Sequence, residues 1–315
     1  MKGGRAVDLL SLRCFQVVAR HEHISRAADE LRTAQPSVSR TIARLEAELG
    51  VPLFDRRGRR IHLNRHGAAF LLRVDRALAE LEDGRRELAD VARAGGGGEV
   101  TVASETLLTL TGLLARFRTA RPGVDVRLRQ ASADTMAHLL RTREADLCFA
   151  SQPLAGPALE SVVLLTEEVL LAVPRGHRLA GRDRVAVAEL AGEPFVTPGR
   201  GHWQRALADR LFERAGVRPT VVCEGDEPGA VLDLVAAGLG VALVPALARE
   251  SGTRDIVAWA GLAASDARRE LRLVRAGGAY ASLGARSLAD FAVGYFGDAS
   301  ARAGGAAGRG GTGAP

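Results

Sequence analysis

The stretch SRAADELRTAQPSVSRTIARLEAELGVPLF, residues 25–54, decides the fold at the N-terminal end of this chain. Apolar residues recur within it at steps of 4, 3 and 4, the spacing of one buried face of an α-helix: Val38, Ile42, Leu45 and Leu49. Pro36 is favoured in the first turn of such a helix, and Gly50 is favoured just beyond its end. The spacing therefore predicts a helix that begins near Ala34–Pro36 and ends at Gly50.

Two further helices are expected before this one, and a hairpin after it. Residues 9–18 carry apolar side chains at helical spacing, and Ser25 is a suitable N-cap for a short second helix. A turn at Arg32-Thr33 then joins two helices as in a helix-turn-helix motif. Two short apolar pieces flank a glycine-centred basic tip, residues 56–60, which predicts a β-hairpin. This order predicts an all-α helix-turn-helix with a basic wing.

The outward face of the predicted third helix carries short or hydrogen-bonding side chains, one arginine and no acid. The N-terminal end of a recognition helix meets base edges, where glutamine pairs with adenine and arginine with guanine. Hydroxyl groups, a helix N-terminus and a basic wing suit phosphates. The alternative is an ordinary three-helix bundle with an exposed arginine loop. The predicted DNA-binding residues are Gln35, Pro36, Ser37, Ser39, Arg40, Thr41, Arg57 and Arg59.

The net charge of the chain is concentrated at this end. Residues 1–66 contain 13 basic and 7 acidic residues and carry the whole net charge of +6, whereas residues 67–315 contain 30 of each. A cationic head on a neutral body favours a polyanionic partner, and double-stranded DNA is the expected one. The alternative is a solvated basic face without a partner.

Residues 68–92 form a proline-free helical pattern with an apolar stripe too wide for a lone surface helix. The stripe is expected to pack against a second copy of the chain. Four glycines, Gly95–Gly98, then mark a flexible boundary. The stripe consists of Phe70, Leu71, Val74, Leu78, Leu81, Leu88 and Val91.

Beyond the glycines, strand and helix patterns alternate, which predicts an α/β domain whose sheet has helices on its faces. Separate strands are expected at Val162–Leu165 and Val169–Val173, and a last helix at residues 286–296. From Gly297 onward the Gly/Ala-rich composition predicts disorder.

A longer set of residues resembles the N-terminal domain of LysR-type transcriptional regulators: Leu12, Phe15, Ser25–Ala28, Leu31, Ala34–Arg40, Ile42, Leu45, Glu46, Leu49, Gly50, Pro52–Phe54, Arg56, Leu63 and Gly67. Two later segments, Glu144–Leu147 and Val235–Pro245, are similar to the effector domain of the same family. The resemblance thus covers nearly the whole chain. It implies a regulator whose promoter binding responds to a small-molecule effector.

The fold implied by the resemblance is α/β with an N-terminal all-α winged helix-turn-helix, a long linker helix and a two-lobed effector domain like that of periplasmic solute-binding proteins. The expected domains are the DNA-binding domain 1–66, the linker and dimerisation helix 67–94, the effector domain 98–296 and a disordered tail 297–315. Lobe one would comprise 98–166 and 268–296, and lobe two 167–267. The family further implies a homotetramer built from dimers, and RNA polymerase as a partner if the protein is an activator.

Three features depart from the family pattern. Asn64 and His66 stand where threonine and alanine are usual, which puts the junction between wing and linker in doubt. Ala34 stands where serine is frequent, so the third helix is expected to lose a side-chain cap that contributes about 1 kcal/mol. The four glycines replace a shorter connection and are expected to loosen the coupling between domains.

Two α/β lobes joined by two crossings leave a cleft at the strand ends, a common place for ligands. Polar residues that follow predicted strands are candidates, with a serine or threonine helix cap and a surface arginine as the alternatives. The Gly-rich loop 197–203 leads into a helix, so its amides and the helix dipole favour an anion. We therefore expect a small carboxylate-type effector. The candidate contacts are Ser104, Thr106, Ser132, Thr197, Arg200 and His202.

Other classes of protein are not indicated. The chain has no Walker loop, no G-x-G-x-x-G after a strand, no H-E-x-x-H and no G-x-S-x-G, so neither an enzyme, nor a cofactor, nor a metal site is expected. Three distant cysteines, no signal peptide and no 20-residue apolar run favour a cytoplasmic protein without a membrane partner. The alternatives are a ligand-independent DNA-binding protein, or a solute-binding protein or enzyme on the two-lobe fold. Cys148, inside an apolar strand, favours an inert thiol over a redox sensor.

Overall fold

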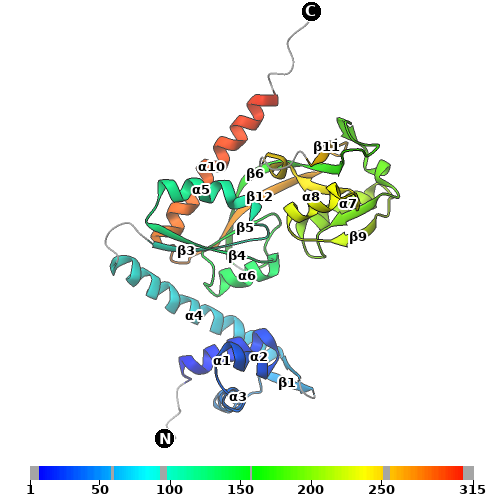
Figure 1. Cartoon of the computed structure of the whole chain (residues 1–315). Helices are drawn as coiled ribbons and strands as arrows, with labels where there is room; N and C mark the ends of the chain where they lie inside the picture. The colour runs from blue at the N-terminus through cyan, green and yellow to red at the C-terminus, as the bar shows by residue number, and fades with distance from the viewer. Residues whose placement is uncertain (1–6, 58–59, 93–97, 157, 251–255, 308–315) are drawn as a thin grey trace, which may run out of the picture. The chain divides into compact units, whose positions relative to one another are not determined.

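The computed structural model describes residues 7–57, 60–92, 98–156, 158–250 and 256–307 (Figure 1). The chain divides into two compact units. The N-terminal unit comprises Met1–Leu88 with Arg141–Arg143, and the C-terminal unit comprises Ala89–Leu140 with Glu144–Pro315.

The N-terminal unit contains three helices, a hairpin and most of a long fourth helix. The helices α1, α2 and α3 pack around Phe15 and Leu45, which are fully buried. The N-cap of the second helix lies two residues earlier than expected, because His23 rather than Ser25 caps it by accepting from the amide of Arg26. The bounds are α1 Leu9–His21, α2 Ile24–Glu30, α3 Gln35–Leu49, β1 Phe54–Arg57, β2 Arg60–Leu63 and α4 Arg65–Ala92.

Asn64 forms the junction between the hairpin and α4. Its side-chain oxygen accepts hydrogen bonds from the amides of His66 and Gly67, both at 2.9 Å, and so caps the helix. Its side-chain nitrogen donates to the carbonyl of Pro52 at 2.9 Å. A Cβ atom on Gly67 would lie 2.2 Å from the carbonyl oxygen of Leu53, so only glycine fits there. The unusual Asn64 therefore serves as the cap of this junction.

The apolar stripe of α4 has two parts with different surroundings. Val74 is buried in the core of the N-terminal unit, and Phe70, Leu71 and Leu78 pack partly against the same core. This first part of the stripe therefore packs within its own chain, where the sequence predicted a second copy. The helix turns further residues to solvent beyond that core, and these exposed side chains are Leu81, Leu88 and Val91.

The C-terminal unit is built on a sheet of order β4-β3-β5-β12-β6-β11-β7, with β10 also paired to β6. A smaller parallel pair, β8 and β9, is joined to β10 through a bridge between Phe195 and Val241. The strands are β3 Gly98–Ser104, β4 Val124–Gln130, β5 Leu147–Ala150, β6 Leu159–Pro174, β7 Arg184–Val185, β8 Pro194–Thr197, β9 Thr220–Glu224, β10 Ala242–Pro245, β11 Val257–Leu262 and β12 Arg268–Ala276.

Helices cover both faces of this sheet (Figure 1). Alternation along β5 gives the reason, because Leu147 and Phe149 face α5 and α10 whereas Cys148 and Ala150 face α6. Two further clusters of buried residues lie around Phe195 and Val235, at the other end of the unit. The helices are α5 Thr111–Ala120, α6 Ala133–Arg141, α7 Trp203–Arg214, α8 Pro228–Ala236, α9 Ala246–Glu250 and α10 Leu283–Ala307, with 3-10 turns at Leu108–Leu110 and Val187–Leu190.

The long strand β6 corrects one expectation. The sequence predicted two strands separated by the polar residues Thr166, Glu167 and Glu168, but β6 runs without a break from Leu159 to Pro174. It pairs with β12 through residues 159–168, and with β10 and β11 through residues 169–174. The polar residues lie where the strand passes from one set of partners to the other, so they interrupt the apolar pattern but not the hydrogen bonding.

The last helix corrects another expectation. We predicted disorder from Gly297, but α10 continues to Ala307. Alanine has the highest helix propensity, and extending an existing helix avoids the cost of nucleating a new one. The predicted disorder at residues 308–315 lies outside the described residues.

Candidate functional site

The N-terminal end of α3 is the candidate nucleic-acid interface. Val38, Ile42 and Leu45 are buried on one side of the helix. Gln35, Pro36 and Arg40 are exposed, and the other predicted contacts Ser37, Ser39 and Thr41 are partly buried. The structure therefore brings the six predicted residues of α3 to one end of the helix, with the base-reading types outermost.

Two details of α3 favour an anion at its N-terminus. The N-cap residue Ala34 has no side-chain acceptor, so it does not compete with an anion for the first backbone amides of the helix. The guanidinium of Arg40 donates from Nε to the carbonyl of Pro36 at 3.2 Å, which holds it toward that end.

The backbone of Arg57 ends β1 in the antiparallel wing hairpin. Arg59, the other predicted wing contact, lies outside the described residues.

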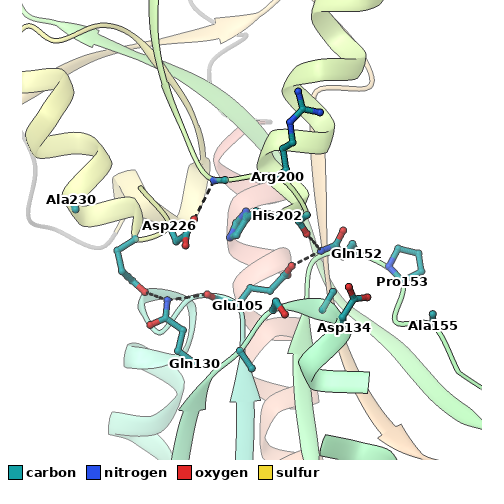
Figure 2. A pocket seen from close by; sticks show the side chains of 16 residues that line it. Glu105, Gln130, Asp134, Gln152, Pro153, Ala155, Arg200, His202, Asp226 and Ala230 are labelled. Carbon is teal, nitrogen blue, oxygen red and sulfur yellow. Dashed lines mark hydrogen bonds between the residues drawn. The ribbon is translucent and has the colours of Figure 1, made fainter. Parts of the chain in front are cut away.

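The candidate effector site is a cleft of about 1010 Å³ in the C-terminal unit. Figure 2 shows its walls, which come from the ends of β3, β4, β5 and β9 and from the loop before α7. Two glutamine amides cross it. The amide of Gln130 donates to Glu227 Oε1 at 2.7 Å, and that of Gln152 donates to the carbonyl of Gly201 at 3.0 Å. The two sides of the cleft are thus held together by neutral donors.

Three of the predicted effector contacts line this cleft, namely Ser132, Arg200 and His202. The other three are buried behind it, because their positions next to strands place them inside the sheet. The Ser104 hydroxyl donates to the carbonyl oxygen of Thr106 at 2.9 Å. The hydroxyl oxygens of Thr106 and Thr109 lie 3.0 Å apart. Thr197 is also buried and does not line the cleft.

Ser132 has a structural role in addition to its place on the cleft. Its Oγ lies 3.0 Å from the hydroxyl of Thr135 and 3.4 Å from the Thr135 amide, in the first turn of α6. Ser132 therefore both caps α6, which was the alternative to a ligand contact, and lines the cleft.

The Gly-rich loop does not present itself as an anion site. The amide of Gly199 donates to Asp226 Oδ1 at 3.2 Å, so the chain's own carboxylate occupies the position expected for an effector. The ring of His202 caps α7 by accepting from the amide of Gln204 at 3.3 Å. Burial lowers the pKa of His202 to about 4, which keeps the ring neutral at pH 7. The guanidinium of Arg200 extends away from Glu105, Gln130 and Asp134 (Figure 2).

Both parts of the chain match family models. Residues 9–68 match the bacterial regulatory helix-turn-helix protein of the lysR family, and residues 93–297 match the LysR substrate binding domain.

The chain belongs to the LysR family.

It is a DNA-binding transcriptional regulator with an effector-binding domain. The HTH-type transcriptional regulator YybE of Bacillus subtilis is 36% identical over 238 residues, which cover 75% of this chain and 82% of the relative. CbnR, a LysR family regulator solved in complex with its target DNA, has 26% identity and a TM-score of 0.53 over 92% of this chain and 99% of its own. Full-length OxyR of Pseudomonas aeruginosa, at 22% identity, shares the fold with a TM-score of 0.66 over 91% of this chain and 95% of its own.

The sequence analysis did not predict the acidic and amide residues of the candidate effector cleft. Glu105 follows β3, Asp226 and Glu227 follow β9, and Gln130 and Gln152 lie at the ends of β4 and β5. The carboxyl ends of parallel strands meet at one edge, and that rule selects these residues as well as the hydroxyl-bearing and basic residues that the sequence analysis named.

A buried arginine lies on β12, opposite Glu167 of its antiparallel neighbour β6. Arg269 is 4% exposed, and its three guanidinium nitrogens donate to Ser151 Oγ at 2.8 Å, Glu167 Oε1 at 3.1 Å and Thr109 Oγ1 at 3.0 Å. Its guanidinium carbon lies 5.1 Å from the centre of the Trp203 ring. Each of the three guanidinium nitrogens of Arg269 thus makes at least one hydrogen bond within the protein.

The cysteines and the helices bear on other functions. Burial raises the pKa of Cys148 to about 12, which favours the inert thiol for that residue. Within the described residues, no three histidine, cysteine, aspartate or glutamate side chains are grouped so as to hold a metal ion. No helix of the described chain has both the length and the apolar character needed to cross a membrane.

Proposed function

We propose that this LysR regulator reads a dyad-symmetric promoter site with the N-terminal end of α3, and that a small molecule in the cleft shifts it between two states of assembly. The observation that carries the DNA-binding part is the division of α3, whose apolar residues are buried while Gln35 and Arg40 stand exposed at an uncapped helix end. Glutamine and arginine are the side chains that pair bidentately with adenine and guanine.

Self-association supplies the second recognition helix that a dyad-symmetric site needs. Three apolar side chains that α4 leaves exposed beyond the core of the N-terminal unit are the ones we assign to the contact with a second copy: Leu81, Leu88 and Val91. A homotetramer, a cytoplasmic location, and RNA polymerase as a partner in activation belong to this proposal by family membership. A relative supports DNA binding, since CbnR was solved in complex with its target DNA.

The domain limits inferred from the sequence remain part of this proposal. The DNA-binding domain takes residues 1–66, the linker 67–94 and the effector domain 98–296. In support, the family models meet the chain at residues 9–68 and 93–297.

The test begins with the full-length protein and a random pool of duplex DNA, from which bound sequences are enriched. Gln35→Ala and Arg40→Ala should each weaken binding to the enriched site by about 1–3 kcal/mol and change binding to random duplex much less. Arg44→Ala is the matched control, because the Arg44 guanidinium lies on the same helix but pairs with Asp8 and Ser11.

The outcomes distinguish four interpretations. Loss at the enriched site alone supports base reading by α3. Equal losses on both duplexes would mean that these residues only hold the phosphate backbone. No binding to any duplex would overturn the regulator function itself, and full binding that never responds to a metabolite panel would favour the ligand-independent alternative.

A further inference from the structure

Four carboxyl groups line the effector cleft without an ion pair. They belong to Glu105, Asp134, Asp226 and Glu227, and none of them lies within salt-bridge distance of a basic side chain in the described part of the chain. The basic side chain on the cleft wall, Arg200, extends away from Glu105 and Asp134 (Figure 2). The cleft therefore carries an excess of negative charge, of which the buried Arg269 offsets part by its charge attraction to Glu105.

Glu105 makes this imbalance specific. The side chain is 95% buried, being 5% exposed, and its carboxylate accepts only from neutral donors, the Ser151 amide at 2.9 Å and the Gln152 side chain at 2.8 Å. The nearby Arg269 attracts this carboxylate by its charge, but its hydrogen bonds go to Ser151, Glu167 and Thr109. A buried carboxylate is normally paired with a cation, because removal from water disfavours the charge. Burial accordingly raises the pKa of Glu105, and also that of Glu227.

His202 offers the cleft a hydrogen-bond donor, whereas the carboxylates offer acceptors. Its Nδ1 accepts from the Gln204 amide, so the proton of the neutral ring lies on Nε2. This Nε2 is buried and has no hydrogen-bond partner in the described residues. A ligand oxygen could supply the missing acceptor once the cleft wall adjusts to it.

We propose that the cleft binds a small organic cation, with an ammonium or guanidinium group among the carboxylates of Glu105, Asp226 and Glu227 and a hydrogen-bond acceptor directed to His202. The proposal rests on the proposed effector-binding function and names its ligand class. It replaces the carboxylate-type effector expected from the sequence, because Asp226 already occupies the amide of Gly199 that was assigned to an anion.

Three probes of equal length test the sign of the ligand charge on the full-length protein: 4-amino-1-butanol, 1,4-butanediol and 4-hydroxybutanoate. Each has four carbons and a hydroxyl at one end, and the other end carries an ammonium, a hydroxyl or, with the fourth carbon included, a carboxylate. Titration calorimetry at constant ionic strength should show saturation by the amino alcohol at a concentration at least about tenfold below that of the other two, since charge-assisted hydrogen bonds are the stronger ones.

Two variants locate the effect. Asp226→Asn and Glu227→Gln remove the charge and keep the shape and the acceptor oxygen, and each should weaken binding of the amino alcohol about tenfold. Asp209→Asn is the control, because Asp209 lies on α7 outside the cleft and pairs with Arg205 at 2.9 Å.

Each remaining outcome overturns the cation. Tighter binding of 4-hydroxybutanoate would give the ligand the opposite charge, and so would cleft variants that leave the amino alcohol unaffected while the anion still saturates. Saturation by none of the three below about 10 mM, a binding free energy weaker than about 3 kcal/mol, would also reject it. The duplex titrations of the wild-type protein are read separately, so the DNA-binding regulator can stand while the ligand class fails.

Discussion

Replacing Arg269 with methionine should destabilise the C-terminal unit more than any change to an exposed ion pair. Methionine keeps the apolar contact with Trp203 but removes the guanidinium that neutralises Glu167, itself 8% exposed. Leaving one member of a buried pair without its partner lowers the free energy of unfolding by about 3–5 kcal/mol. For a unit of this size, that corresponds to a fall in Tm of about 6–20 °C.

Tryptophan fluorescence during urea denaturation measures this loss in the relevant unit. The chain has two tryptophans, Trp203 and Trp259, and both belong to the C-terminal unit. Arg275→Met is the matched control, since Arg275 joins the same strands through an exposed pair with Glu160 and should change the unfolding free energy by about 0–1 kcal/mol.

The double variant Arg269→Met with Glu167→Gln separates charge from packing. Because glutamine removes the stranded charge, the double variant should lose less stability than the sum of the two single variants. If Arg269→Met lowers the free energy of unfolding by less than about 1 kcal/mol, or if the effects of the two substitutions are strictly additive, the reasoning that this ion pair stabilises the pairing of β6 and β12 is refuted.

Two further predictions concern the N-terminal unit. Leu88→Glu, at a side chain that is 72% exposed, should leave folding intact and lower the mass measured by light scattering. Leu78→Glu should instead destabilise the unit, because Leu78 packs on the core of its own chain. Equal masses for the wild type and Leu88→Glu would exclude this surface from the contact between copies. Gly67→Ala should lower the Tm of the helix-turn-helix unit, as followed by circular dichroism, because its Cβ would meet Leu53 O at 2.2 Å, whereas Gly84→Ala, with nothing within 4 Å, should not.

The helix-turn-helix was accessible from sequence because its information is local. Val38, Ile42 and Leu45 follow a helical period, and Pro36 and Gly50 mark the ends of the same element. The start of α2 was less accessible, since His23 and Ser25 are two residues apart and only the backbone angles decide which of them caps the helix.

The C-terminal unit was harder where residues far apart in sequence determine the outcome. Glu167 interrupts an apolar pattern and so predicted a break in β6, but its partner Arg269 lies 102 positions away and makes a buried acid acceptable inside a continuous strand. The prediction of an anion site at the cleft was wrong for a similar reason. The loop before α7 has the composition of an anion site, and only the fold brings Asp226 from the end of β9 to fill it.

The tight joint at Asn64 and Gly67 makes the hairpin and α4 a lever. With 28 residues and a rise of 1.5 Å per residue, α4 is about 42 Å long. Because the first half of α4 packs on the helix-turn-helix core, the two turn together, and a rotation of 10° about the first turn of α4 displaces its far end by about 7 Å, more than half the width of a DNA major groove. Conversely, a displacement of that size imposed on the far end would re-aim α3 by only about 10°, so this geometry converts coarse movements of the linker into fine adjustments of the recognition helix.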